Sequence, residues 1–431
     1  MKLLIVIPAL NEEQSIERTI HRCLAARDLI TRGSSVTDVE ITVVSDGSTD
    51  RTAELARRHT PAINLIVFET NRGYGAAIKE AWKRSDADLL GFIDADGTCD
   101  PTFFVDLCRT LVAADADVVL GSRVHKESRM PLLRRIGNKI FAWMLGTLSA
   151  SRIRDTASGM QVVRRDSLPR LLPLPDGLHF TPAMTAKALM SNAVRIIAVD
   201  MPYAEREGRS KLSIVKDSLR FLRVILEAAF LYWPGRPLAI LAATCLAAAT
   251  VLMAMPLEYY LRHHSVPEWM IYRFVVAHLA GTAGFLFLGA SHLTTKIVDI
   301  TLQLPRRHGP AARALGSFFR SRAFWLAPAF LVLAGGALVL PGFVERVETG
   351  RIYEHWSRFV VMSFSWSVAF VLIVSRSIDY VLDLLATQLG YAREHASDYA
   401  PRPAVAAGSV WRVVRRSVVP RTHQTSPRQS S

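Results

Sequence analysis

The first half of the chain alternates short apolar runs with amphipathic segments. Short runs rich in Ile, Val and Leu predict five buried strands, at Lys2–Ile7, Glu40–Val44, Leu65–Phe68, Asp88–Ile93 and Asp117–Leu120. Segments with helical spacing of apolar positions lie between them, at Gln14–Leu29, Asp50–His59, Gly75–Arg84 and Pro101–Ala114. Strands that alternate with helices predict an α/β fold built on a doubly wound, parallel sheet.

The pattern changes after about residue 212. Residues 213–236 combine a charged stripe with apolar positions, which predicts an amphipathic helix lying at a membrane surface. Four nearly uncharged runs follow, at about Leu238–Met255, Phe274–Leu293, Phe324–Val344 and Phe359–Val374. Each approaches the length of about 20 residues that crosses a bilayer. We therefore expect an α-helical membrane region with four transmembrane helices at residues 237–376. A core helix of a second domain is the alternative for residues 213–236.

Basic residues are unevenly divided among the segments that connect these runs. Leu257–Tyr272 and Glu345–Trp356 hold few of them. The segment between the second and third runs holds Lys296, Arg306, Arg307, Arg313, Arg320 and Arg322. The positive-inside rule then places the head (residues 1–212), this segment and the tail (residues 377–431) in the cytoplasm. From Ala400 the tail is rich in Pro, Ser, Arg and Gln, which predicts disorder.

Composition limits the classes of partner and site that we expect for this protein. The net charge of +14 would fit a nucleic-acid-binding protein. The basic residues, however, lie mostly in loops beside apolar runs, so membrane topology and anionic phosphate ligands explain them better and we expect no nucleic acid. The four cysteines form no CxxC pair, which argues against a disulfide framework or a structural zinc site. Asn11–Glu13 interrupts the apolar start of the chain, so a first strand fits better than a signal peptide.

Polar motifs follow each predicted strand. They are Pro8–Glu13, Ser45–Asp50, Asn71–Gly75, Asp94–Gly97 and Gly121–Arg123. Each alone is an ordinary turn or helix cap. Together they should share one edge of the sheet, where ligands of doubly wound folds bind. Asp94 and Asp96 offer hard oxygen ligands there, and these select Mg²⁺ or Mn²⁺, which would neutralise a departing nucleotide diphosphate.

The ordered runs PALNEE, DGSTD, NRGYGAA, DADGT and GSR resemble the family 2 glycosyltransferases, whose head has a nucleotide-diphospho-sugar transferase (GT-A-like) fold. The resemblance continues through Asp155–Gly159. It ends in Tyr203–Leu212, which is similar to the Y-x-x-R-x-G-x-S-K-L signature of the dolichyl-phosphate mannose synthase branch. Two positions depart from the family pattern. Gln161 stands where arginine is frequent, and Pro182–Met184 stands where Pro-Glu-Leu is frequent.

This resemblance implies an inverting transfer of one sugar from a UDP- or GDP-linked donor to an undecaprenyl or dolichyl monophosphate. It implies a donor site made of Pro8, Ala9, Asn11, Glu13, Asp46, Asp94, Arg123 and Lys211. The implied catalytic residues are Asp94, Asp96 and Arg206, with Asp96 holding the metal. The acceptor phosphate is assigned to Arg134 or Arg135 together with Ser210. Asp94 could orient the sugar or act as a base. Asp46 could cap a following helix, alone or together with nucleotide contact. Membrane lipids complete the expected partners, and a homo-oligomer is left open.

Residues 129–148 combine apolar positions with Arg134, Arg135 and Lys139. This pattern is typical of a helix lying on a membrane surface, and an ordinary amphipathic helix packed on the head is the alternative.

Two other functions compete with single-sugar transfer. A processive polysaccharide synthase would share the head and the membrane helices, but its Q-x-x-R-W motif is absent from this sequence. A non-catalytic membrane scaffold would not need Asp94, Asp96, Arg123 and Arg206, all of which are present.

Overall fold

The computed structural model describes residues 1–123, 132–149, 153–191, 193–202, 214–302, 309–351 and 354–394. The chain forms two compact units, residues 1–377 and residues 378–431. Within the second unit, residues 378–394 are the last part of one long helix, α13 (Trp356–Glu394).

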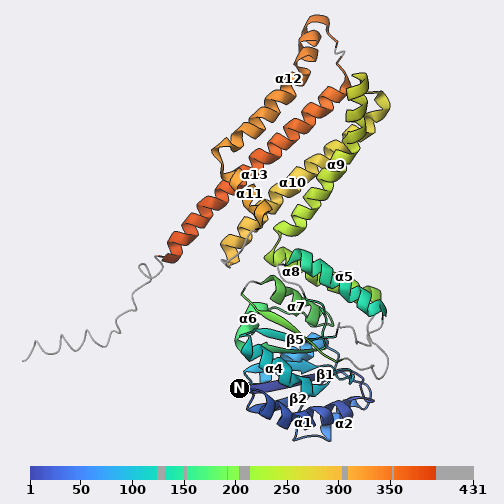
Figure 1. Ribbon diagram of the computed structural model, residues 1–431, viewed down its shortest axis with the longest axis vertical. Coiled ribbons are helices and arrows are strands. Elements are labelled where there is room, and N and C mark those ends of the chain that lie inside the picture. The colour runs from blue at the N-terminus through green and yellow to red at the C-terminus, as the bar shows by residue number, and fades with distance from the viewer. Residues whose placement is uncertain are drawn as a thin grey trace, which may run out of the picture. The chain divides into compact units, whose positions relative to one another are not determined.

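A sheet organises the head (Figure 1). It has seven strands, in the order β3-β2-β1-β4-β6-β5-β7. Its strands are β1 (Lys2–Ala9), β2 (Asp38–Asp46), β3 (Asn64–Phe68), β4 (Leu89–Ile93), β5 (Val118–Ser122), β6 (Met160–Arg164) and β7 (Ile196–Asp200). The five strands that the sequence predicts are present. β1 pairs in parallel with β2 and β4, and the chain then crosses back from β3 to β4, so the strand order switches direction at β1.

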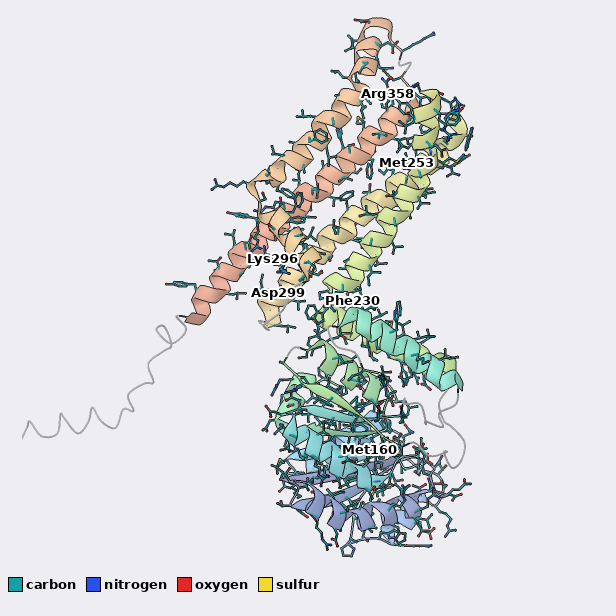
Figure 2. All side chains as sticks on the ribbon, viewed as in Figure 1. Met160, Phe230, Met253, Lys296, Asp299 and Arg358 are labelled. Carbon is teal, nitrogen blue, oxygen red and sulfur yellow. The ribbon has the colours of Figure 1, made fainter. Side chains whose placement is uncertain are left out.

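The sequence predicted a parallel sheet, whereas the sheet is mixed. β6 pairs antiparallel with both β4 and β5. A short apolar run such as Met160–Arg164 shows that a strand is buried but not in which direction it runs, so the pattern of the sequence could not reveal this inserted strand. Met160 is fully buried at the start of β6 (Figure 2).

Helices cover both faces of the sheet, which confirms the doubly wound arrangement. Leu3 and Ile5 of β1 pack in one core with α1 (Ile16–Gly33) and α4 (Phe104–Ala113). Leu4 of β1 packs in a second core with α3 (Tyr74–Arg84) and α7 (Phe180–Met190). Successive side chains of a strand point to opposite faces, so one apolar strand supplies both cores. The shorter helices are α2 (Thr52–Arg57) and α6 (Leu168–Leu171).

Two amphipathic helices, α5 (Leu132–Leu148) and α8 (Ile214–Tyr232), pack against α7. Leu145 of α5 and Ile225 of α8 are buried in this third core. Other apolar side chains of the same helices remain exposed. On α5 they are Ile136, Ile140 and Trp143, and on α8 they include Leu219, Phe230 and Leu231. The packed face of α5 agrees with the interpretation of an amphipathic helix on the head. Its exposed apolar stripe is what a membrane-surface helix would require, and contact with a membrane stays a prediction.

Four helices in the described part of the chain are long and apolar enough to cross a membrane, with candidate spans at Gly235–His263, Glu268–Leu302, Arg322–Glu348 and Trp356–Tyr391. They correspond to α9 (Gly235–His263), α10 (Ile271–Leu302), α12 (Leu326–Thr349) and α13. Each candidate span contains one of the four runs expected from the sequence. The amphipathic α11 (Pro310–Arg320) lies between α10 and α12 in the chain. Lys296 and Asp299 occupy the last part of α10 (Figure 2).

Candidate active site

The predicted donor-site residues that the structure describes follow the carboxyl ends of β1, β2, β4 and β5, which all run in the same direction. Pro8 and Ala9 are the last residues of β1 and pair with Val44 and Ser45 of β2. Asp46 ends β2, whereas Asp94 follows β4 and Arg123 follows β5. The topological switch at β1 therefore brings the polar loops to one edge of the sheet, as the sequence predicted.

Hydrogen bonds tie the loop after β1 to the loop after β2. The Oδ1 atom of Asn11 accepts from the backbone N–H of Thr49 at 2.8 Å, and Oε2 of Glu13 accepts from that of Arg51 at 3.3 Å. Asn11 has a φ angle of 49°, in the left-handed region that asparagine tolerates better than most residues. Both side chains thus stabilise the walls of the predicted nucleotide pocket, and their contact with a nucleotide stays a prediction.

Asp46 supports a different turn from the one considered in the sequence analysis. Its Oδ1 and Oδ2 atoms accept from the backbone N–H groups of Arg72 and Gly73, at 2.7 and 2.9 Å. The first turn of α2 is instead held by Asp50, whose Oδ1 accepts from the N–H of Thr52 at 3.0 Å. The alternative role of Asp46 as a helix cap is therefore wrong, because this carboxylate fixes the turn that leads into α3.

The two carboxylates after β4 differ in their surroundings. Asp94 is partly buried, and its Oδ1 accepts from the hydroxyl of Tyr74 at 2.7 Å. Asp96 is buried, and its Oδ1 accepts from the N–H and the hydroxyl of Thr98 at 3.2 and 2.7 Å. Gly97 lies between Asp96 and Thr98 with a φ angle of 73°. The left-handed glycine lets the chain fold back tightly, so that Asp96 is held by its own loop.

Arg123 forms a buried ion pair with Asp155. Its Nε donates to Oδ2 at 2.8 Å and its Nη2 to Oδ1 at 3.0 Å, a two-pronged geometry. Burial would by itself raise the pKa of Asp155, but the Arg123 guanidinium lowers it below the ordinary value. Asn138 of α5 also donates to Oδ1, at 2.9 Å. Because Nε and Nη2 of Arg123 bind protein oxygens, the predicted contact of Arg123 with donor phosphates stays a prediction.

Several predicted residues lie where the structure gives no side-chain description. Arg206, Ser210 and Lys211 are outside the described residues. Arg134 and Arg135 belong to the first turn of α5, but their side chains are likewise outside the description. The predicted acceptor-phosphate site therefore remains a prediction.

The structure adds three residues that the sequence analysis did not assign to the site. Tyr74 and Gly159 contact Asp94, and Asp155 fixes Arg123. All three lie inside motifs that carry the family resemblance, NRGYGAA and Asp155–Gly159, so their position in the sequence was the available signal. Gly159 and Asp155 lie on the segment that leads into β6, the strand whose direction the sequence did not reveal.

The carboxylate oxygens at this edge of the sheet fit a divalent cation that a substrate would help to hold. The described residues contain no group of three or more His, Cys, Asp or Glu that could hold a metal by themselves. Mg²⁺ in phosphate-transferring sites is commonly held by one or two carboxylates plus substrate phosphates, which matches Asp94 and Asp96 on one strand end. Burial raises the pKa of the Cys99 thiol beside them to about 12, so this group stays protonated near neutral pH.

The doubly wound sheet, with carboxylates at its carboxyl edge, defines a GT-A-like glycosyltransferase head. The sequence model of "Glycosyl transferase family 2" matches residues 4–172. Dolichyl-phosphate hexose transferase of Haloferax volcanii is 33% identical over 216 residues, which cover 49% of this chain and 86% of that protein. The chain therefore belongs to glycosyltransferase family 2, and the family and enzyme class predicted from the motifs are confirmed.

Other similar proteins match over different shares of their length. The low-salt glycan biosynthesis hexosyltransferase Agl6 of Haloferax volcanii is 30% identical over 231 residues, and the match spans 52% of this chain but only 53% of Agl6. A crystal structure of glucosyl-3-phosphoglycerate synthase from Mycobacterium tuberculosis with Mn²⁺ and UDP is 19% identical. It matches 53% of this chain and 80% of that one, with a TM-score of 0.41, a likeness too loose to transfer ligands or activity.

Proposed function

We propose that the protein transfers a single sugar from a nucleotide-diphospho-sugar to a polyprenyl monophosphate at the cytoplasmic face of a membrane. The observation that carries this proposal is the gathering of Asp46, Asp94 and Asp96 at one edge of a head whose chain continues into four long apolar helices. The relative that matches over 86% of its length is a dolichyl-phosphate hexose transferase, which supports a lipid phosphate acceptor and a hexose.

The acceptor requires little activation. A phosphate monoester has a second pKa near 6, so it is largely a dianion near neutral pH. One of its oxygens attacks the anomeric carbon. The bond from that carbon to the diphosphate breaks, and the nucleoside diphosphate leaves with the electron pair. Attack from the face opposite the leaving group inverts the anomeric centre. The task of the protein is therefore to align two anions and to stabilise the charge that develops on the diphosphate.

We assign that task to the carboxylate edge together with its cations. Asp96 would hold Mg²⁺ or Mn²⁺ against the donor phosphates, and the ion would stabilise the departing charge. Asp94 would orient the donor sugar. Arg206 and Lys211 are proposed to approach the donor, and Ser210 with Arg134 or Arg135 to bind the acceptor phosphate.

The amphipathic helices suit a lipid acceptor. Ile136, Ile140 and Trp143 are spaced by four and three residues, so they form one stripe on α5, and Lys139 is exposed beside it. Apolar anchors with an adjacent cation are what a helix at an anionic membrane surface requires. We propose that α5 and α8 rest on the membrane surface, with the head, the segment between α10 and α12, and the tail in the cytoplasm.

A transfer assay tests this function. The full-length protein in lipid vesicles would receive undecaprenyl phosphate or dolichyl phosphate, Mg²⁺ or Mn²⁺, and a panel of UDP- and GDP-sugars. We expect a lipid carrying one sugar, which disappears with EDTA or without the acceptor and returns when the metal is restored. A polymeric product would favour a processive synthase. The absence of any product from folded protein across the panel would overturn the proposal in favour of a scaffold.

A further inference from the structure

The hydroxyl of Tyr74 lies in hydrogen-bond contact with Asp94, a carboxylate assigned to the donor sugar. The distance from the tyrosine oxygen to Oδ1 of Asp94 is 2.7 Å. A carboxylate oxygen accepts in such a bond, so the hydroxyl is the donor.

The ring of Tyr74 is fixed by an aromatic cluster. Its centroid lies 6.3 Å from that of Phe92 on β4 and 6.5 Å from that of Phe180 on α7, and both contacts are edge-to-face. Trp82 closes the cluster through its own contacts with Phe92 and Phe180. Edge-to-face pairs of this kind stabilise a particular ring orientation, so the hydroxyl has a defined direction.

The backbone that carries Tyr74 is clamped on both sides. Asp46 binds the two N–H groups immediately before it, those of Arg72 and Gly73. The two N–H groups immediately after it, those of Gly75 and Ala76, donate to the carbonyl oxygen of Asp176 at 2.6 and 3.0 Å. The start of α3 is thus attached to β2 and to the segment before α7.

Gly159 confines the other oxygen of the same carboxylate. A Cβ atom placed on Gly159 would lie 1.8 Å from Oδ2 of Asp94, so no larger residue fits unless the carboxylate moves. The backbone N–H of Asp94 also donates to the carbonyl oxygen of Gly159 at 3.0 Å. The Asp94 carboxylate is therefore held between a tyrosine hydroxyl and a glycine.

We propose that Tyr74 is a positioning residue, which orients the Asp94 carboxylate toward the donor sugar while Gly159 leaves that carboxylate the space it needs. This inference rests on the proposed function. It assigns to Tyr74 and Gly159 a role in catalysis exerted through Asp94, without contact of their own with the reacting atoms.

Tyr74→Phe tests the role, because it removes the hydroxyl and keeps the ring packing. Removing a hydrogen bond to a charged group should lower kcat/KM for the donor by about tenfold to a hundredfold. The melting temperature should stay close to that of the wild type. The affinity for the matching nucleoside diphosphate without its sugar, measured by calorimetry, should change by less than about twofold because Asp94 acts on the sugar. An equal loss of nucleoside diphosphate affinity, or unchanged kcat/KM, would overturn the proposal.

Two further variants separate positioning from general damage. In an Asp94→Ala background no carboxylate remains to be oriented, so adding Tyr74→Phe should not weaken binding of the nucleotide-sugar further. A further loss of the same size as in the wild-type background would mean that Tyr74 acts independently of Asp94. Gly159→Ala, with Tyr74 intact, should reduce kcat/KM at least as strongly as Tyr74→Phe, and full activity would contradict the proposed confinement.

Ser167→Ala is the matched control. Its buried hydroxyl donates to Asp117 at the start of β5, so it is a second hydroxyl–carboxylate pair, away from the carboxyl edge. The control should lose stability and keep kcat/KM. If the proposed function itself is wrong, the wild-type protein will give no transfer in this assay. Wild-type transfer with fully active Tyr74→Phe would reject the positioning role alone.

Discussion

At the carboxyl edge of the sheet polar side chains are buried, whereas on α5 and α8 apolar side chains are exposed. Asp96 and Asp155 are 7% and 0% exposed, and each accepts hydrogen bonds from the protein. Trp143 and Leu219 are 71% and 62% exposed. Both regions depart from the usual distribution of residues, in opposite directions, although α5 and α8 pack directly on the head through α7.

The two departures have different physical meanings. Burying a carboxylate is costly unless donors surround it, so the edge of the sheet must be built around its acids before any ligand arrives. An exposed apolar stripe has no such internal support and indicates a surface that meets something apolar outside the head. The first region is suited to holding charge in fixed positions, and the second to holding the protein on lipid.

The largest expected effect is at Asp96. Asp96→Ala should reduce transfer by about a thousandfold or more, because the proposed cation contributes several kcal/mol of charge stabilisation. Initial rates measured at increasing Mn²⁺ should show no recovery. Asp100→Asn is the control, since Asp100 lies on the same segment and binds Thr102 as Asp96 binds Thr98, at 3.0 Å to the N–H. If the Asp96→Ala protein kept its activity, the carboxyl edge of the sheet would not have the chemical role assigned to it.

The next effect concerns stability. Asp155→Asn leaves the Arg123 guanidinium buried without its counter-charge, which typically costs about 3–5 kcal/mol in free energy of unfolding. Thermal unfolding of the purified protein should show a clear decrease in melting temperature. Asp86→Asn removes an exposed partner of Lys2, at 2.6 Å, and should cost less than about 1 kcal/mol. If the two variants lost similar free energy of unfolding, the buried Arg123–Asp155 pair would contribute no more to stability than the exposed pair of Lys2 and Asp86.

A smaller effect should separate the apolar stripe from the carboxylate edge. Trp143→Ser should raise the KM for polyprenyl phosphate in vesicles by about threefold to tenfold, because less apolar surface enters the membrane. With a short-chain acceptor in detergent the KM should be unchanged. Leu29→Ser alters an equally apolar residue on α1, 50% exposed, and should affect neither assay. If Trp143→Ser weakened both acceptors alike, the stripe would be acting on the site and not on lipid.

The smallest effect is the acid sensitivity of the buried pair. The pKa of Asp155 is lowered in the folded state, so its contribution to stability is complete above the ordinary aspartate pKa of about 4 and is lost as pH falls through the folded value. The difference in unfolding free energy between wild type and Asp155→Asn should therefore shrink from pH 7 to pH 3. A constant difference over this range would contradict the assigned ion pair.

Local elements could be predicted from the sequence, whereas contacts between segments distant in the chain could not. The runs at β1, β2, β3, β4 and β5 and the four long helices could be read from apolar spacing alone. The place of β6 in the sheet could not be predicted, because the pattern of its five residues does not indicate the direction of the strand or its neighbours. Its insertion between β4 and β5 brings Gly159 against Asp94, so this contact could not be predicted either.

Asp46 shows the same limit at the level of one side chain. Its place at a strand end predicted a site residue, and the structure confirms that location. Its hydrogen-bond partners lie 26 and 27 residues further along the chain, at Arg72 and Gly73, and no local pattern links them. Residue types at strand ends therefore identify a site, whereas the partners of those residues depend on the pairing of strands.

The mass of the lipid product tests the central claim most directly. Wild-type protein in vesicles, given the donor that turns over and undecaprenyl phosphate or dolichyl phosphate, should convert the acceptor to a species heavier by one sugar residue. One nucleoside diphosphate should be released for each product molecule. A ladder of heavier products, or nucleoside diphosphate release without any modified lipid, would contradict single-sugar transfer to a polyprenyl phosphate.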